Sequence, residues 1–178
     1  MKKHGVVVLV MAFVACSSDT SHDGVSTKPP APAVAALMQA QAPAGSIDVV
    51  AAKAAGPADK VVVRGRIAAM TTGRAQFHLM DTGLTYCGEK NVEDCPHPWD
   101  YCCHSSDEQK VHRIVVEVHG ADGQPLPTPS LGDLRLLDLV AVSGKLTKDE
   151  HGNHVLLATG WHRESRPTLR AGLDWPPM

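Results

Sequence analysis

The sequence predicts a small all-β domain, a barrel of five strands with little helix. Five segments carry the β-branched and apolar residues typical of strands, and turn residues separate them. Two of these segments share one pattern, Val-x-Val-x-Gly followed by a basic and an aliphatic residue: "VVVRGRI" at 61–67 and "VAVSGKL" at 140–146. Glycine in the middle of a strand favours a bend or a bulge. We therefore predict that Gly65 and Gly144 lie where a strand bends to serve two edges of a small barrel.

The order of the elements follows from the chain. The predicted strands are 60–68, 75–81, 112–120, 139–147 and 153–163, with the turn "TTGR" (71–74) after the first and the hairpin "KDEHG" (148–152) before the last. A long irregular stretch, 82–110, separates the second strand from the third. The segment "SLGDLRLLD" (130–138) predicts a short helix before the fourth strand.

This strand order and the two glycine-centred strands resemble the oligonucleotide/oligosaccharide-binding (OB) fold, a five-stranded Greek-key barrel. The resemblance covers residues 60–163 of a barrel domain at 60–165. It implies that residues 82–110 form a cysteine-rich insertion between strands 2 and 3. A different small barrel or a sandwich remains the alternative, and the resemblance implies no particular function.

The N-terminus predicts export. Residues 1–15 join a basic start to the apolar run "GVVVLVMAFVA" (5–15), which has the length of a signal peptide. The end of the run, 13–16, resembles the lipobox of bacterial lipoproteins, which implies cleavage before Cys16 and acylation of its thiol. Two or three acyl chains make a durable membrane anchor. We expect an exported, membrane-anchored lipoprotein, and Ser17 after the cysteine favours the outer membrane or the periplasmic face. A secreted protein with a chance cysteine is the alternative.

The remaining segments complete the expected organisation. Residues 16–45 are rich in Ser, Pro, Ala and Gly, and we expect a disordered tether because such a segment buries too little apolar surface to offset its ordering entropy. Residues 46–59 predict a short helix and a linker, with Ser46 as N-cap and Gly56 at the C-terminal end. Residues 166–178 form a C-terminal tail.

Four cysteines besides Cys16 are concentrated in the insertion. Cys87, Cys95, Cys102 and Cys103 follow the spacing Cys-x7-Cys-x6-Cys-Cys. Export favours disulfides. A bridge between the adjacent Cys102 and Cys103 would be strained, because the Cα atoms across a trans peptide are closer than a disulfide prefers. We therefore expect either Cys87 with Cys102 and Cys95 with Cys103, or the reverse pairing, around a core of Trp99 and Tyr101.

A metal site is the alternative use of the same sulfurs. Thiolates of the four cysteines, with His97 or His104 replacing one, would suit Zn or Cu. The spacing is not that of a zinc finger, and the Cys-x-x-Cys typical of thioredoxin-like redox proteins is absent from the sequence. The disulfide hypothesis requires no cofactor, whereas the metal hypothesis requires Zn or Cu in the insertion.

The insertion also resembles a loop of uncharacterised secreted OB-like proteins of planctomycete-type bacteria. The matching residues are Cys95, Pro96, Pro98, Trp99, Asp100, Tyr101, Cys102 and Cys103. This resemblance implies no activity.

Charge and motifs narrow the function. The chain has a net charge of −2, and cleavage before Cys16 removes Lys2 and Lys3, which makes the charge more negative. A general attraction to nucleic acid is therefore not expected. Nucleic-acid binding rests on fold analogy, with Phe77 and Trp161 as stacking residues and Arg64, Arg66, Arg74 and Lys145 as cations. A nucleophile elbow, paired carboxylates and a His-Glu-x-x-His motif are all missing, so no enzyme is expected. The sequence predicts a binding or interaction module anchored to the cell envelope, with an envelope ligand or protein as partner.

Overall fold

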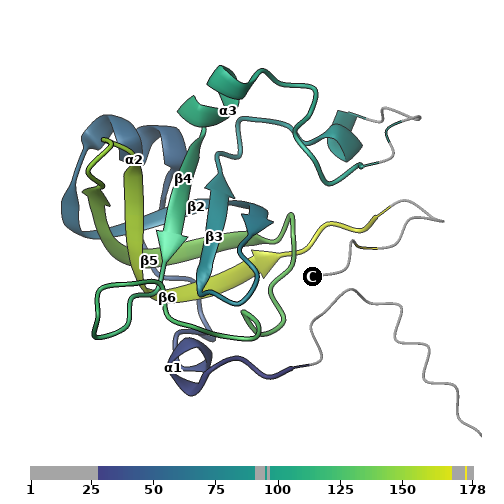
Figure 1. Ribbon diagram of the computed structural model, residues 1–178. Coiled ribbons are helices and arrows are strands. Elements are labelled where there is room, and N and C mark those ends of the chain that lie inside the picture. Colours follow the sequence, from purple (N-terminus) through teal and green to yellow (C-terminus); the bar gives the residue numbers. More distant parts are fainter. Residues whose placement is uncertain (1–27, 91–94, 96, 170–174, 176–178) are drawn as a thin grey trace, which may run out of the picture.

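The computed structural model describes residues 28–90, 95, 97–169 and 175, and within them five long strands form a closed barrel (Figure 1). The barrel strands are β2 (Ala58–Met70), β3 (Gln76–Met80), β4 (Arg113–Glu117), β5 (Leu139–Lys148) and β6 (His154–Ser165), and a short β1 (Ile47–Asp48) pairs with β2. The helical elements are α1 (Pro32–Ala35), α2 (Val49–Ala55), the 3₁₀ turn η1 (Cys87–Lys90) and α3 (Ser106–Val111).

The pairing of the strands confirms the OB-like barrel. The order along the sheet is β1-β2-β3-β4-β6-β5, and β2 closes the barrel by pairing also with β5. All barrel pairs are antiparallel except β4 with β6, which are parallel. Five predicted strands therefore lie where the sequence put them, within a few residues at each end.

The two mid-strand glycines are required by close contacts between strands. A Cβ atom on Gly65 would lie 2.6 Å from the carbonyl oxygen of Met80 and 2.7 Å from Cγ of Leu79. A Cβ atom on Gly144 would overlap the carbonyl group of Leu157. The pairing of β5 with β6 also shifts register between Ser143 and Gly144, as expected for a bulge. Both glycines are therefore sterically required, and the irregularity expected in the strand is present at Gly144.

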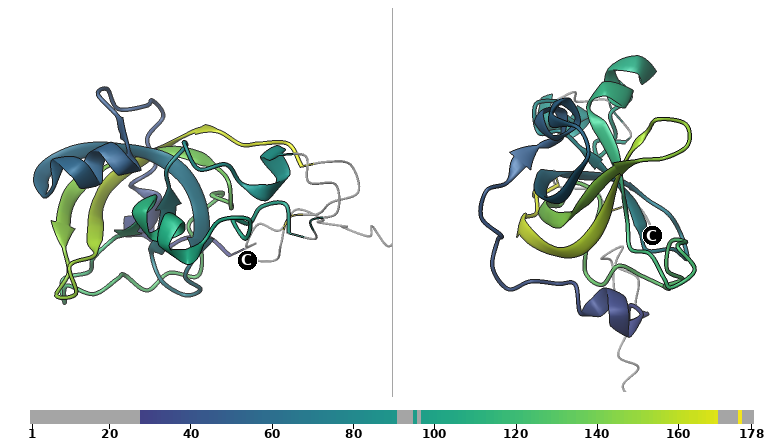
Figure 2. Two further views of the ribbon diagram at one scale, coloured as in Figure 1. Left: turned by 90° about the horizontal axis from the view of Figure 1, so that it is seen from above. Right: turned by 90° about the vertical axis from the view of Figure 1, so that its left-hand side faces the viewer.

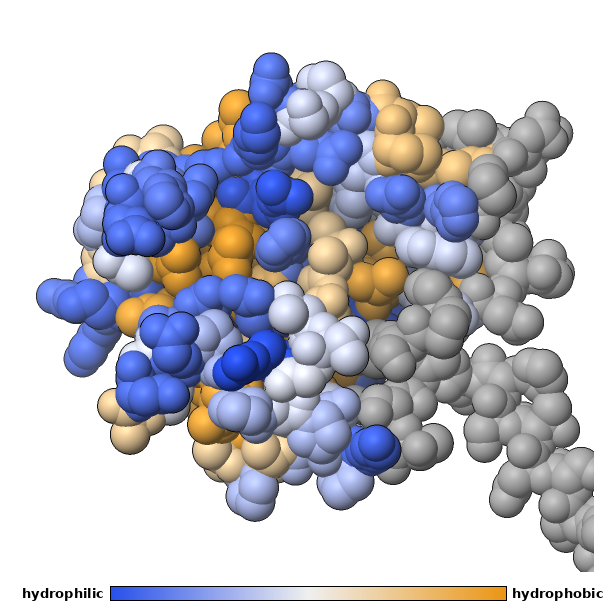
Figure 3. Space-filling view, in the orientation of Figure 1, coloured by the Kyte–Doolittle hydropathy of each residue, from blue (hydrophilic) through white to orange (hydrophobic). Residues whose placement is uncertain are grey.

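Alternating side chains of the strands fill the barrel. Buried residues of the five barrel strands form one apolar cluster, which includes Ile67, Leu79, Val116 and Val142. Within it, the rings of Phe77 and Trp161 pack in a T-shaped arrangement. Hydrophilic residues cover most of the face drawn in Figure 3, and apolar side chains are seen between them.

The expectation of a disordered tether is wrong for residues 28–45. Val34, in α1, is 1% exposed and belongs to the barrel core. The backbone amide of Gln39 donates to the carbonyl of Trp161, and the amide of Trp161 donates to the carbonyl of Leu37, each at 2.8 Å. One buried valine and this strand-like pairing with β6 order a segment whose overall composition predicts disorder. Residues 16–27 lie outside the described part of the chain.

The helix expected at 46–56 is present but begins later. It is α2, Val49–Ala55, and it ends at Gly56, whose φ of 82° is in the left-handed region. Ser46 is not the N-cap. Instead Asp81, at the end of β3, accepts a 2.7 Å hydrogen bond from the amide of Val50 in the first turn. The cap therefore comes from a residue remote in sequence.

The helix expected at 130–138 is not formed, because the backbone there bonds to β2. The amide of Leu137 donates to the carbonyl of Ile67 at 2.7 Å, and the amide of Ile67 donates to the carbonyl of Asp138 at 3.0 Å. Leu137 has a φ of 64°, which ends any helix. The buried Asp138 carboxylate pairs with Arg166, so the start of the C-terminal tail is fixed to the residue that precedes β5.

A second, smaller core attaches the cysteine insertion to the barrel. Met80 and Leu137 from the barrel side pack with Leu84 and Tyr101 from the insertion, and Trp175 of the C-terminal tail packs against this cluster. The left view of Figure 2 shows the insertion projecting from one end of the barrel. This placement leaves the cysteines outside the barrel but rigidly connected to it.

Candidate metal centre

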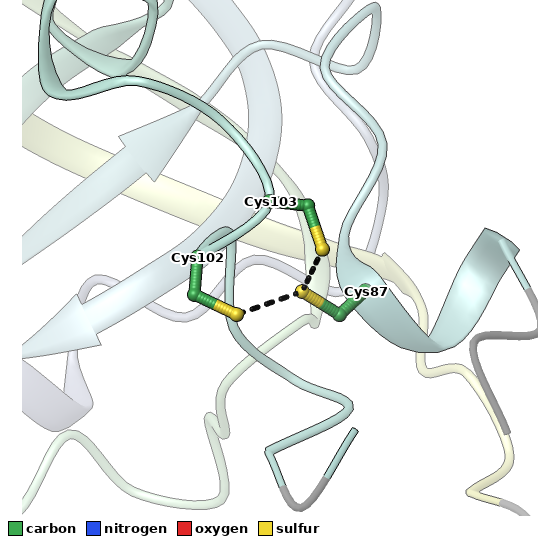
Figure 4. A group of neighbouring side chains, drawn as sticks. All are labelled: Cys87, Cys102 and Cys103. Atoms are coloured by element: carbon green, nitrogen blue, oxygen red, sulfur yellow. Dashed lines mark hydrogen bonds between the residues drawn. The ribbon is translucent and has the colours of Figure 1, made fainter. Parts of the chain in front are cut away.

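The side chains of three cysteines of the insertion point toward one another (Figure 4). The Sγ atom of Cys87 lies 3.3 Å from Sγ of Cys102 and 3.4 Å from Sγ of Cys103. All three sulfurs lie within 4.8 Å of one another. Cys87 is buried, whereas Cys102 and Cys103 are exposed, so the cluster has one inner and two outer ligand atoms.

Backbone pairing with the opposite side of the loop positions Cys87. Its amide donates to the carbonyl of Asp100 at 2.8 Å, and the amide of Gly88 donates to the carbonyl of Pro98 at 2.7 Å. A Cβ atom on Gly88 would lie 2.8 Å from that same carbonyl oxygen. Glycine at 88 therefore allows the two sides of the loop to approach closely, which holds the Cys87 sulfur beside residues 102 and 103.

Tyr101 and α3 position the two outer cysteines. Tyr101 is 2% exposed and anchors the chain immediately before Cys102 in the second core. The side-chain amide of Gln109, in α3, donates to the carbonyls of Tyr101 and His104 at 3.0 and 3.1 Å. These bonds fix both ends of the segment that carries Cys102 and Cys103. The backbone of the vicinal pair is therefore held beside Cys87.

Interactions at both ends hold α3 in place. Ser105 caps its first turn by accepting a hydrogen bond from the amide of Glu108. The ammonium group of Lys53, on α2, donates to the carbonyls of Lys110, Val111 and Arg113 at its C-terminal end. A cation at this end also satisfies carbonyls that the helix leaves without partners. Lys53 thus links α2 to the element that supports the cysteines.

The surroundings of Cys102 favour the protonated form of its thiol. The hydrogen bond with Cys87 contributes most, followed by burial and the charge of Cys87, and together they raise the pKa of the Cys102 thiol to about 12. Burial also raises the pKa of the Tyr101 hydroxyl. Reactive redox cysteines have lowered pKa values. This environment is therefore unlike that of a nucleophilic thiol.

The two expected disulfides are not formed in the structure. Cys87, Cys95, Cys102 and Cys103 are all free cysteines. Among the described residues, the shortest distance between two of these sulfurs is 3.3 Å, from Cys87 to Cys102. A disulfide bond has a length of about 2.05 Å. Cys87 is nevertheless adjacent to both of the partners proposed for it from sequence. The structure therefore brings Cys87 close to Cys102 and Cys103, as either expected pairing requires, and shows no bond between them.

The other residues proposed as ligands have different places. Cys95 lies beside Cys102, since their hydrogen bond contributes to the raised pKa of Cys102, but it is not part of the three-sulfur group. His97 is exposed and packs its ring against Trp99 at 5.9 Å between centroids. His104 directs Nε2 to the carbonyl of Thr85 and Nδ1 to Glu108, so both ring nitrogens are engaged. Cys16 lies outside the described residues.

The residues proposed for nucleic-acid stacking and charge have other contacts. Phe77 and Trp161 are each 1% exposed and pack in the barrel core, where no base could reach them. The four proposed cations interact within the chain: Arg64 with Glu164 and Asp48, Arg66 with Glu89 and the ring of Tyr86, Arg74 with the carbonyl of Pro125, and Lys145 with Asp59.

Sequence reasoning missed the residues that support the cluster. Lys53 and Gln109 act through carbonyl groups, and no local pattern marks either residue because Lys53 is 57 to 60 positions from its partners. Arg66 was considered only as a surface cation. It lies beside the cysteine insertion, 3.7 Å from Glu89 and near the buried Tyr101.

The arrangement fits a thiophilic metal ion. Zn–S bonds of about 2.3 Å place two sulfurs of a tetrahedral site about 3.8 Å apart, so sulfurs 3.3 to 4.8 Å apart need shifts of only a few tenths of an ångström to about 1 Å. Thiolate ligands select Zn and Cu(I) over harder cations. The exposed side of Cys102 and Cys103 leaves room for a fourth ligand.

Comparisons with known proteins give no family for this chain. No family model and no curated protein matches it. One solved structure with a similar arrangement is described as an aspartyl-tRNA synthetase from Leishmania major Friedlin, with a TM-score of 0.39 and 12% identity. The match covers 75% of this chain and 25% of that one. Among the described residues, no helix has the length and apolar character needed to cross a bilayer.

Proposed function

We propose that this protein is a metal-binding module of the cell envelope, which holds one Zn²⁺ or Cu⁺ ion through Cys87, Cys102 and Cys103. The observation that supports the proposal is the convergence of these three sulfurs within 4.8 Å. The role is binding rather than catalysis. The barrel serves as the scaffold, and its second core, built around Tyr101, preorganises the ligands.

In an exported protein, a bound metal would explain why these thiols stay reduced. In an oxidising compartment, thiols only 3.3 Å apart are converted to disulfides unless something else occupies the sulfurs. A bound ion takes up the thiolate lone pairs and keeps the three residues reduced. The proposal of an exported protein and the finding of free, converging thiols are consistent with each other when a metal fills the cluster.

The lipid anchor is proposed from the N-terminal sequence. Acylation of Cys16 would fix the chain to a membrane, with the outer membrane or the periplasmic face as its location, and residues before Lys28 would connect the anchor to the barrel. The metal site would then act at the membrane surface. Its partner would be a donor or acceptor of a soft metal ion in the envelope.

The test is the metal and thiol content of the full chain, extracted in detergent without reductant. We expect about one equivalent of Zn or Cu and three thiols, those of Cys87, Cys102 and Cys103, that react with an alkylating agent only after a chelator is added. Cys103→Ser should lose the metal, whereas His97→Ala should keep it, because His97 lies outside the sulfur group. A metal-free protein with a mass four hydrogens below that of its reduced form would contradict the proposal and restore the disulfides.

A further inference from the structure

A separate cleft lies between the barrel and the cysteine insertion, and none of the four cysteines lines it. It has a volume of about 410 Å³. Three regions distant in sequence form it: the end of β2 and the following turn (68–74), Trp99 and Asp100 of the insertion, and the segment 128–136. Ligand sites for small molecules commonly have volumes of about 300–1,000 Å³.

The floor of the cleft is apolar and only partly buried. Ala68, Ala69, Met70, Trp99 and Leu136 line it, and each keeps an intermediate exposure. Apolar side chains left half-buried in a hollow gain free energy when a ligand removes them from water. Trp99 adds an aromatic wall, which favours a ligand with a flat ring.

Most polar groups at the rim already have partners within the chain. Thr128 accepts from the amide of Ala31 and donates to the carbonyl of Ser130, whose hydroxyl donates to the carbonyl of Lys28. Arg74 donates to the carbonyl of Pro125, and Asp100 accepts from the amide of Tyr101. The rim therefore does not need hydrogen bonds from a ligand.

The charges at the rim are balanced. Arg74 and Asp100 carry opposite charges, and the other lining residues are uncharged. A charged ligand would be attracted by one of these groups and repelled by the other, and it would also lose hydration of its charge on binding. An uncharged ligand avoids this desolvation cost. The size of the cleft, its apolar lining and its balanced charge together favour an uncharged, mostly apolar small molecule.

We propose that this cleft is a binding site for an uncharged, mostly apolar small molecule carrying an aromatic ring that packs on Trp99. The site is independent of the metal proposal, because its residues are not the sulfur ligands. Trp99 nevertheless belongs to the same loop, whose residues 98 and 100 bond to Cys87 and Gly88.

The proposal can be tested with N-phenyl-1-naphthylamine, an uncharged fluorescent probe, on the full chain in detergent below its critical micelle concentration. We expect saturable fluorescence enhancement with a dissociation constant of about 10–100 µM, the range for a compact ligand of this size. The sulfonated analogue 1-anilinonaphthalene-8-sulfonate supplies the same rings with a negative charge, and it should bind at least tenfold more weakly.

Two matched variants locate the binding. Ala69→Phe fills the cleft and should weaken probe binding at least tenfold. Thr159→Phe places the same side chain on the exposed surface of β6, in a different cleft, and should leave binding unchanged. Thermal unfolding of both variants verifies folding, and Leu136→Phe is a second way to fill the cleft if Ala69→Phe does not fold. Absence of saturable binding, equal binding of the charged probe, or a loss in Thr159→Phe but not in the filling variants would overturn the proposal.

Discussion

The backbone amide of Cys87 donates a 2.8 Å hydrogen bond to the carbonyl of Asp100, and this bond fixes the buried sulfur opposite the two cysteines that follow Tyr101. Because the bond joins main-chain atoms, it does not depend on the oxidation state of the thiols. The cluster is therefore preorganised by the fold of the insertion, and metal binding does not have to order the loop first.

The three-sulfur group predicts unequal roles for the four cysteines. Cys87→Ser should lower metal affinity by more than ~100-fold, since it removes a ligand, while Cys95→Ser should cost about tenfold, as expected for an outer partner of a metal ligand. Competition with a chromophoric chelator measures both affinities. Equal losses in the two variants would show a four-cysteine site and contradict the three-ligand assignment.

The mid-strand glycines predict large losses of stability. Gly144→Val should lower the free energy of unfolding by more than about 2 kcal/mol, because the new side chain would overlap the Leu157 carbonyl group, and overpacking typically costs about 1–3 kcal/mol. Gly65→Val should have a similar effect. Lys145→Ala is the matched control next to Gly144, since Lys145 forms only an exposed ion pair with Asp59. Denaturant unfolding that gives the same midpoint for all of these variants would refute the steric account.

The remote helix cap can be tested by comparing two aspartates. Asp81→Ala removes the hydrogen bonds from the amides of Val50 and Gly83 and should destabilise the protein by about 1–2 kcal/mol. Asp48→Ala changes the residue at the N-cap position itself, whose side chain makes no cap bond, and should cost less than about 0.5 kcal/mol. Thermal unfolding distinguishes them. A larger loss for Asp48→Ala would mean that the local residue is the effective cap.

The lipid anchor predicts a change of location without a change of fold. Cys16→Ser should leave an uncleaved precursor or release the protein from membranes, because the acylated thiol is the proposed anchor. Fractionation and intact mass of the product measure this. Cys95→Ser, which does not affect the lipobox, is the control. An unchanged membrane fraction with an unchanged mature mass would refute lipidation of Cys16.

The sequence predicted the barrel well because its signals are local. β-Branched segments and the two glycines that neighbouring strands require, Gly65 and Gly144, are visible in short windows of the chain. The misassigned helix at 130–138 shows the limit of such reasoning: its apolar spacing suits a helix, but Leu137 and Asp138 bond to Ile67 on β2. Contacts between segments about 70 residues apart decide that conformation, and no local pattern contains them.

The candidate site was predicted in composition but not in geometry. The spacing of Cys87, Cys102 and Cys103 identified residues that come together, whereas the distances between their sulfurs depend on how the insertion folds, which the sequence alone does not give. Residues 28–45 illustrate the same limit. Their composition predicts disorder, but Val34 packs into the barrel core and orders the segment. Lys53 was missed because its role is to bind main-chain carbonyls on a distant helix.

X-ray absorption spectroscopy of the native, detergent-extracted protein at the Zn and Cu edges tests the central claim most directly. The account predicts a first coordination shell with at least three sulfur atoms at about 2.3 Å, which disappears in Cys87→Ser. A shell of nitrogen and oxygen atoms, or a protein without metal whose cysteines are paired, would contradict it.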